Sequence, residues 1–69
     1  MSKEEKQKKM LEFAKLVRSE REKRGWSQEK LGQEAGVATN TVFSVEHASP
    51  TVPRTRAKVA VALEIDYVW

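Results

Sequence analysis

Apolar residues recur at the spacing of a helix in four stretches of the chain, with short polar breaks between them. The first stretch spans about residues 3–24 and ends before Gly25, a residue suited to the turn after a helix. The last long stretch spans about residues 53–63 and begins at Pro53, which suits the first turn of a helix. Since no stretch alternates with the period of a strand, the pattern predicts an all-α fold.

The apolar positions of these two outer helices are expected to face the core. In the first helix they are Met10, Phe13, Ala14 and Val17, with Leu16 at the margin. In the last helix they are Ala57, Val59, Ala60 and Leu63. The first two turns of the first helix lack apolar residues, so we expect residues 1–9 to form a basic N-terminal extension that projects from the core. Asp66 is placed to cap one more turn through residues 67–69, which would complete a fifth helix.

Residues 27–46 have the pattern of two short helices joined at Gly36, which can adopt the left-handed conformation that ends a helix. Ser27 can cap the first of these helices. The inner faces of the two helices carry Leu31, Ala35, Val42 and Val45. The outer face of the second helix carries Thr39, Asn40, Phe43 and Ser44. A helix-turn-helix with an uncharged, hydrogen-bonding outer face is the arrangement that reads base edges in the major groove of DNA.

Length and composition narrow the class of protein. With 69 residues, the chain is predicted to form a single helix-turn-helix domain over residues 1–69. It has no cysteine, which excludes disulfides and thiolate zinc sites, and no apolar run approaches the length of a membrane span. We therefore expect a cytoplasmic protein, associated with the nucleoid, that has no membrane partner.

The net charge of +3 is unevenly distributed along the chain. Residues 1–24 hold nine Lys or Arg against five Glu, residues 25–50 carry a net charge of −2, and residues 51–69 carry +1. Basic charge therefore flanks the predicted reading helix, which suits phosphate contacts at the edges and neutral polar contacts in the middle. The alternative is that the Lys-rich first helix is simply solvated.

The chain offers no set of residues for catalysis. Its one histidine, His47, has no cysteine and no carboxylate at ligand spacing, so we expect no metal site. No nucleophile, base and orienting group occur together, and no glycine-rich phosphate loop is present, so neither an enzyme nor a cofactor is expected. Trp26 is expected to pack against the first two helices, with stacking on bases as the alternative.

The run from Arg21 to Trp69 resembles the helix-turn-helix domain of the lambdoid phage repressor and Cro family, often called Xre-like. The resemblance covers about 49 of the 69 residues without a gap. It rests on the combined spacing of Arg21, Gly25-Trp26-Ser27-Gln28, Leu31, Gly36, Thr41-Val42, Glu46, Pro53-Arg54 and Ala62-Leu63. It implies a compact lambda-repressor-like domain of four to five helices that binds double-stranded operator DNA as a two-fold dimer.

Taken with the residue types, the resemblance assigns roles to individual side chains. Contacts with base edges fall to Gln28, Thr39, Asn40, Phe43 and Ser44. Contacts with phosphates or the minor groove fall to Ser27, Arg21, Thr41, His47 and Arg54. The resemblance also pairs Arg21 with Glu46 in a partly buried bridge between the first helix and the end of the third. Gln28 has a phosphate as its alternative partner.

Several of these residues have a second interpretation. Asn40 can pair with N6 and N7 of adenine, or it can remain a solvated residue or an alternative helix cap. Phe43 can touch thymine methyl groups, or it can lie against the loop through residues 48–53. The hydroxyls of Thr41 and Ser44 can instead form local hydrogen bonds.

The sequence departs from the family pattern mainly near helix ends. Ala38 stands where a capping Ser or Thr is usual, so the cap either shifts to Thr39 or is lost at a cost of about 1 kcal/mol. Gly32 replaces a usual Ala, which still lets two helices approach but lowers helix propensity by up to about 1 kcal/mol. Ala48 and Glu64 each replace a usual Gly.

We interpret the chain as a sequence-specific transcriptional repressor, of the phage immunity-repressor or Xre type, that reads operator half-sites with its third helix. The alternative is a protein-interaction module on the same fold, such as an antitoxin or a coactivator-type adaptor. Since only six residues follow Leu63, we expect a monomer in solution that forms a weak homodimer on DNA. The chain would then be the DNA-binding part of a longer protein that dimerises elsewhere.

Overall fold

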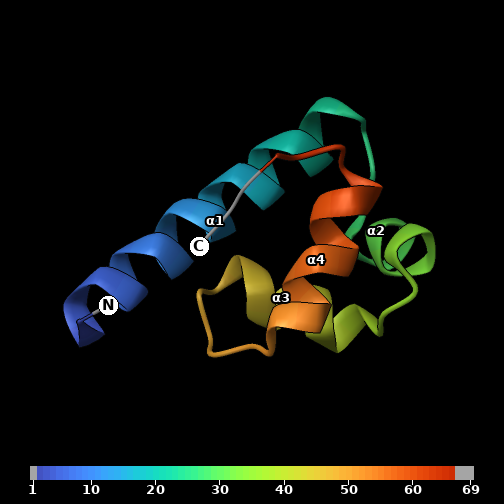
Figure 1. The fold of residues 1–69 in the computed structure, drawn as a ribbon. Helices are drawn as coiled ribbons and strands as arrows, with labels where there is room; N and C mark the ends of the chain where they lie inside the picture. The colour runs from blue at the N-terminus through green and yellow to red at the C-terminus, as the bar shows by residue number, and fades with distance from the viewer. Residues whose placement is uncertain (1, 67–69) are drawn as a thin grey trace.

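The computed structural model describes residues 2–66, and within that range it contains four α-helices and no strand. The helices are α1 (Lys3–Lys23), α2 (Gln28–Ala35), α3 (Thr39–Glu46) and α4 (Pro53–Ala62). Figure 1 shows α1 as a long rod, with the three short helices gathered beside its C-terminal half. The predicted all-α fold is confirmed, and α1 and α4 each end one residue before the predicted position. The fifth helix predicted through residues 67–69 lies outside the described residues.

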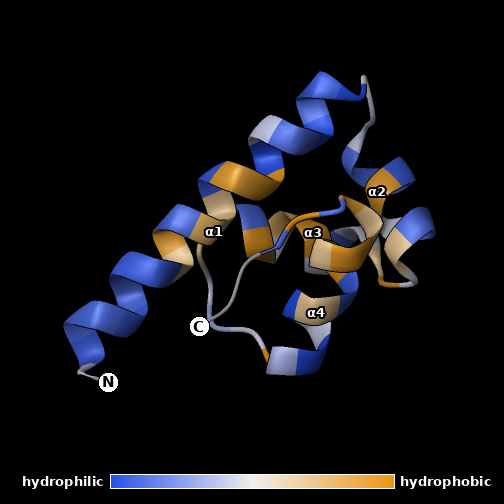
Figure 2. Cartoon of the chain, turned by 45° about the horizontal axis from the view of Figure 1, so that its top comes forward, coloured by the Kyte–Doolittle hydropathy of each residue, from blue (hydrophilic) through white to orange (hydrophobic). Residues whose placement is uncertain are grey.

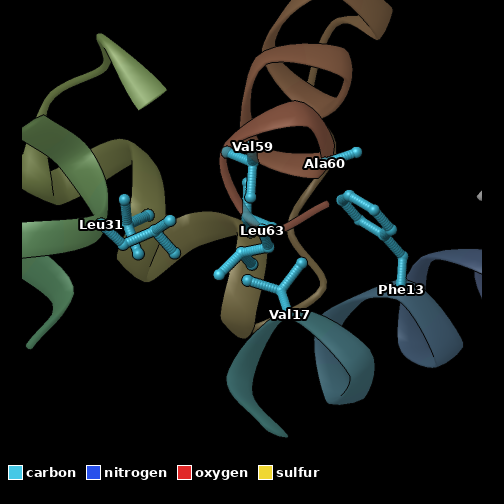
Figure 3. Close-up of a cluster of buried hydrophobic side chains, with 8 residues drawn as sticks. Phe13, Val17, Leu31, Val59, Ala60 and Leu63 are labelled. Carbon is cyan, nitrogen blue, oxygen red and sulfur yellow. The ribbon is translucent and has the colours of Figure 1, made fainter. Parts of the chain in front are cut away.

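All four helices contribute to one core. The buried apolar side chains are Phe13, Ala14, Val17, Leu31, Val42, Val45, Val59, Ala60 and Leu63. In Figure 3, Phe13 reaches from α1 toward Ala60 of α4, and Val17 lies close to Leu63. Figure 2 shows hydrophilic residues along the first turns of α1 and hydrophobic ones where the helices meet. The core therefore sits against the C-terminal half of α1, and none of the described helices is long and apolar enough to cross a membrane.

One predicted core position is wrong. Ala57 is exposed, whereas Val59, Ala60 and Leu63 are buried. Successive residues of an α-helix turn by about 100°, so residues 57 and 59 lie on nearly opposite sides of α4 and cannot face the same core. The helix buries the narrow stripe through Val59 and Leu63, and Ala57 falls outside it.

Every described helix ends in the same left-handed turn. The left-handed residues and their φ angles are Gly25 (67°), Gly36 (72°), Ala48 (57°) and Glu64 (56°). After each of them, the next backbone N–H donates to the carbonyl five positions earlier, at 2.8 to 3.1 Å. Ala48 and Glu64 stand where the resembled family has Gly, and they keep the turn at a cost of roughly 1–2 kcal/mol each.

The contact between α2 and α3 depends on a glycine. A Cβ atom placed on Gly32 would lie 2.8 Å from the carbonyl oxygen of Val37, closer than real Cβ contacts allow. The carbonyl of Gly32 itself accepts a hydrogen bond from the Val37 N–H at 2.9 Å. Gly32 therefore brings the backbone of the turn directly against α2, which sets where α3 begins.

Candidate nucleic-acid interface

The helix α3 has two contrasting faces. Its inner face buries Val42 and Val45 in the core, between α1 and α2. Its outer face exposes Thr39, Asn40 and Phe43, which all point away from that core. Thr41 and Ser44, the remaining hydroxyl residues of the helix, are partly buried at the margin. The structure thus places three of the predicted reading residues, Thr39, Asn40 and Phe43, on one exposed, uncharged surface, with Ser44 at its margin and Gln28 on α2.

The start of α3 keeps its cap at Ala38. The Ala38 backbone is extended, with φ −69° and ψ 153°, and no side chain caps the helix. Its carbonyl oxygen accepts hydrogen bonds from the N–H groups of Thr41 and Val42, at 3.0 and 3.2 Å. The sequence allowed either a shift of the cap to Thr39 or the loss of a side-chain cap, and the structure shows the second. The Thr39 hydroxyl is therefore not used as a cap and stays on the outer face of the helix.

The expected bridge between Arg21 and Glu46 is present. Nε and Nη2 of Arg21 donate to the two carboxylate oxygens of Glu46, at 2.6 and 3.0 Å. Nη1 of Arg21 donates to the carbonyl of Trp26 at 2.8 Å. The side chains are only 14% and 3% exposed, and the bond to Glu46 raises the pKa of Arg21 above its ordinary value. This bidentate pair joins the end of α1 to the end of α3 and holds the angle of α3.

A third residue joins the same carboxylate, which sequence reasoning did not find. Nε2 of Gln28, the first residue of α2, donates to Oε1 of Glu46 at 3.3 Å. Three helices therefore meet at Glu46. The preceding residue, Ser27, caps α2 as predicted, because its Oγ accepts the N–H of Lys30 at 3.0 Å.

The aromatic residue on the outer face is held by a neighbour. The rings of Phe43 and His47 stack with centroids 3.9 Å apart and an angle of 23° between planes. Nδ1 of His47 donates to the carbonyl of Phe43 at 2.8 Å, which leaves Nε2 pointing away from that bond. The Phe43 side chain stays 51% exposed, so its ring is available on the outer face of α3.

A second arginine ties the helix ends together, and sequence reasoning also missed it. Nη2 of Arg24 donates to the carbonyl of Leu63 at 2.9 Å, and Nη1 pairs with Glu20 at 3.1 Å. The hydrogen bonds from Lys23 and then Arg24 lower the pKa of Glu20. The Arg24 guanidinium lies 5.7 Å from the ring centroid of Trp26, which packs against the core as expected.

Arg54 is not engaged within the described fold in the way that Arg21 and Arg24 are. It lies in the first turn of α4 and is exposed. Among the described residues, no ion pair or hydrogen bond engages its side chain. Its charge is therefore available for an external anion.

These features define a class of protein, a DNA-binding domain that presents the second helix of a helix-turn-helix on its surface. The chain matches the helix-turn-helix family model over residues 17–66. It belongs to this family, the Xre and lambda-repressor-like helix-turn-helix domains, whose members are regulators that bind double-stranded DNA. No curated protein matches the chain. The match begins at residue 17, so the first fourteen residues of α1 precede it.

Proposed function

We propose that this chain acts as a sequence-specific transcriptional repressor of the phage immunity-repressor or Xre type, with α3 in the major groove of an operator half-site. The observation that carries this proposal is the division of α3 into a buried face and an exposed, uncharged, hydrogen-bonding face. A reading helix needs such a face, because bases are distinguished by hydrogen bonds and methyl contacts rather than by charge.

Base reading centres on Asn40. Its amide can donate to N7 and accept from N6 of adenine in a bidentate pair. The hydroxyls of Thr39 and Ser44 lie one residue before and one turn after it, where they meet neighbouring bases. Phe43, held by its stack with His47, contacts thymine methyl groups.

Phosphate contacts surround this face. Gln28 uses one amide N–H on Glu46, and its second N–H donates to a phosphate or an outer base. Arg54, which forms no ion pair with residues 2–66, supplies its guanidinium to a phosphate or to the minor groove. Three of the five N–H groups of Arg21 hold the fold, so its phosphate contact uses the remaining two. Further contacts come from Ser27, Thr41 and His47.

The chain by itself is monomeric, and two copies pair only weakly on a two-fold operator. Among residues 2–66, the exposed large apolar side chains are Leu11 on α1, Phe43 on α3, Val52 at the N-cap of α4 and Val61 on α4. A stable dimer normally buries upward of about 1,000 Å² in one continuous interface. Sedimentation equilibrium without DNA tests this proposal, and a dimer at low micromolar concentration contradicts it.

Selection of bound sites from a random duplex pool tests the repressor proposal directly. We expect a short consensus that contains adenine at the position read by Asn40, arranged in half-sites about one helical turn apart. Asn40→Ala should weaken binding of the selected duplex by about 1–3 kcal/mol and remove the preference for adenine at that position. A chain without affinity for any duplex at low salt would contradict the proposal and favour a protein-interaction module on the same fold.

A further inference from the structure

A groove runs between the N-terminal half of α1 and the loop that connects α3 to α4. Its volume is about 700 Å³. One wall comes from α1 and includes Lys3, Lys6 and Met10; the other includes Pro50, Pro53 and Arg56. Figure 1 shows the α3–α4 loop beside this half of α1, which extends past the rest of the fold. We call this feature the α1–loop groove.

The lining of the α1–loop groove combines positive charge with apolar carbon. Its charged residues are all cations, namely Lys3, Lys6 and Arg56. The acidic residues of the same α1 segment, Glu4 and Glu5, do not line it. A sugar-phosphate strand has matching chemistry, because its phosphates bind Lys and Arg while the carbon faces of its sugars pack on apolar side chains.

The wall formed by the loop is held by Arg56. Its Nη1 donates to the carbonyl oxygen of Thr51 at 2.6 Å, which ties the loop to α4. Pro50 and Pro53 restrict the backbone on either side of this bond. The groove therefore has one wall on a helix and another on a braced loop.

The α1–loop groove is continuous with the reading helix. Ala48, which lines the groove, directly follows His47, the C-cap of α3. A protein that reads bases also makes phosphate contacts, which fix its position and orientation on the duplex. The cationic lining of the groove therefore adjoins the helix that is proposed to read the half-site.

We propose that the α1–loop groove holds one sugar-phosphate strand beside the half-site, with Lys3 and Lys6 on its phosphates. This inference rests on the proposed function, since it takes α3 as the reading helix. It assigns a binding role to a part of α1 that precedes the family match at residue 17. Met10 and the two prolines supply the apolar surface for the sugars.

The test compares two double variants that remove the same charge from α1. Lys3→Gln with Lys6→Gln removes the cations of the groove, and Lys8→Gln with Lys15→Gln removes two exposed lysines outside it. Affinity for a duplex selected from a random pool is measured by fluorescence anisotropy between about 50 and 200 mM salt. With a slope of about 0.9 per phosphate contact, the groove variant should flatten the salt slope by about 1.8 and lose roughly 60-fold in affinity at 0.1 M salt. The control variant should keep the wild-type slope.

Equal slopes for the two double variants would overturn the inference. If wild-type protein binds the duplex and Asn40→Ala loses discrimination at one base pair, while the groove variant does not differ from the control, the inference alone fails. If wild-type protein binds no duplex, the proposed function fails with it. Binding of an acidic peptide by the groove, with an unchanged DNA salt slope, would likewise contradict a DNA role. Circular dichroism of each variant verifies that α1 remains helical.

Discussion

The eight-residue helix α3 has one face that packs in the core and one face that is proposed to bind DNA. On the inner side, Val42 and Val45 are buried, the Glu46 side chain is only 3% exposed, and its carboxylate accepts hydrogen bonds from two other helices. On the outer side, Thr39 and Asn40 are exposed. Changes on the inner face should therefore alter stability, whereas changes on the outer face should alter only binding. The residues that orient α3 are therefore different from the residues that are proposed to recognise DNA.

The largest effect is expected from Glu46→Ala. This change leaves the guanidinium of Arg21, which is only 14% exposed, without its carboxylate partner. Loss of one member of a buried pair typically costs about 3–5 kcal/mol of unfolding free energy. For a domain of this size each kcal/mol corresponds to roughly 4–8 °C in Tm, so thermal unfolding should shift down by more than about 10 °C.

A matched control is available in an exposed ion pair. Glu34→Ala removes the partner of Lys30, and both side chains are nearly half exposed. Such pairs contribute about 0–1 kcal/mol, so Tm should hardly change. If Glu46→Ala and Glu34→Ala have the same effect on Tm, the pair with Arg21 does not hold the fold.

The outer face gives the next largest effect, on specificity. Asn40→Ala should reduce discrimination at one base pair by about 1–3 kcal/mol, because the bidentate contact with adenine is lost. The free energy of unfolding should stay within about 0.5 kcal/mol, since the side chain is exposed. Competition binding with singly substituted duplexes measures the first quantity and denaturant unfolding the second. A large loss of stability would contradict the separation of the two faces.

Arg54→Ala should weaken binding without changing specificity. Loss of one phosphate contact flattens the salt slope by about one unit and lowers affinity to a similar extent for every sequence. Arg18→Ala is the control, because Arg18 is an exposed arginine of α1 paired with Glu22. An effect of Arg54→Ala confined to one base pair would instead place this residue among the reading side chains.

The smallest effect concerns the left-handed helix ends. Ala48→Gly relieves strain at a φ of 57° and should stabilise the fold by about 0.5–1 kcal/mol, after the greater flexibility of the unfolded chain is allowed for. Glu64→Gly should act in the same direction. Gly25→Ala is the reverse control: a Cβ there would meet nothing within 4 Å, so any loss of stability comes from the backbone alone. Thermal unfolding of the three variants measures these differences.

The sequence by itself determined the helices, their order and most of their ends. Helical spacing predicted α1 and α4 to within one residue at each end, and Ser27 and Gly36 marked the limits of α2. These features are local, because a cap or a left-handed turn involves residues only a few positions apart. The bridge between Arg21 and Glu46 spans 25 residues and was reached only through the resemblance to a known family.

Only the tertiary structure decided which long side chains meet. Gln28 reaches Glu46 across 18 residues, and Arg24 reaches the carbonyl of Leu63 across 39. Apolar spacing indicates that a helix has an inner face, but it does not say which polar group of another helix lies at its edge. The same holds for the α1–loop groove, because its two walls approach each other only once the core has fixed the angle between α1 and α3.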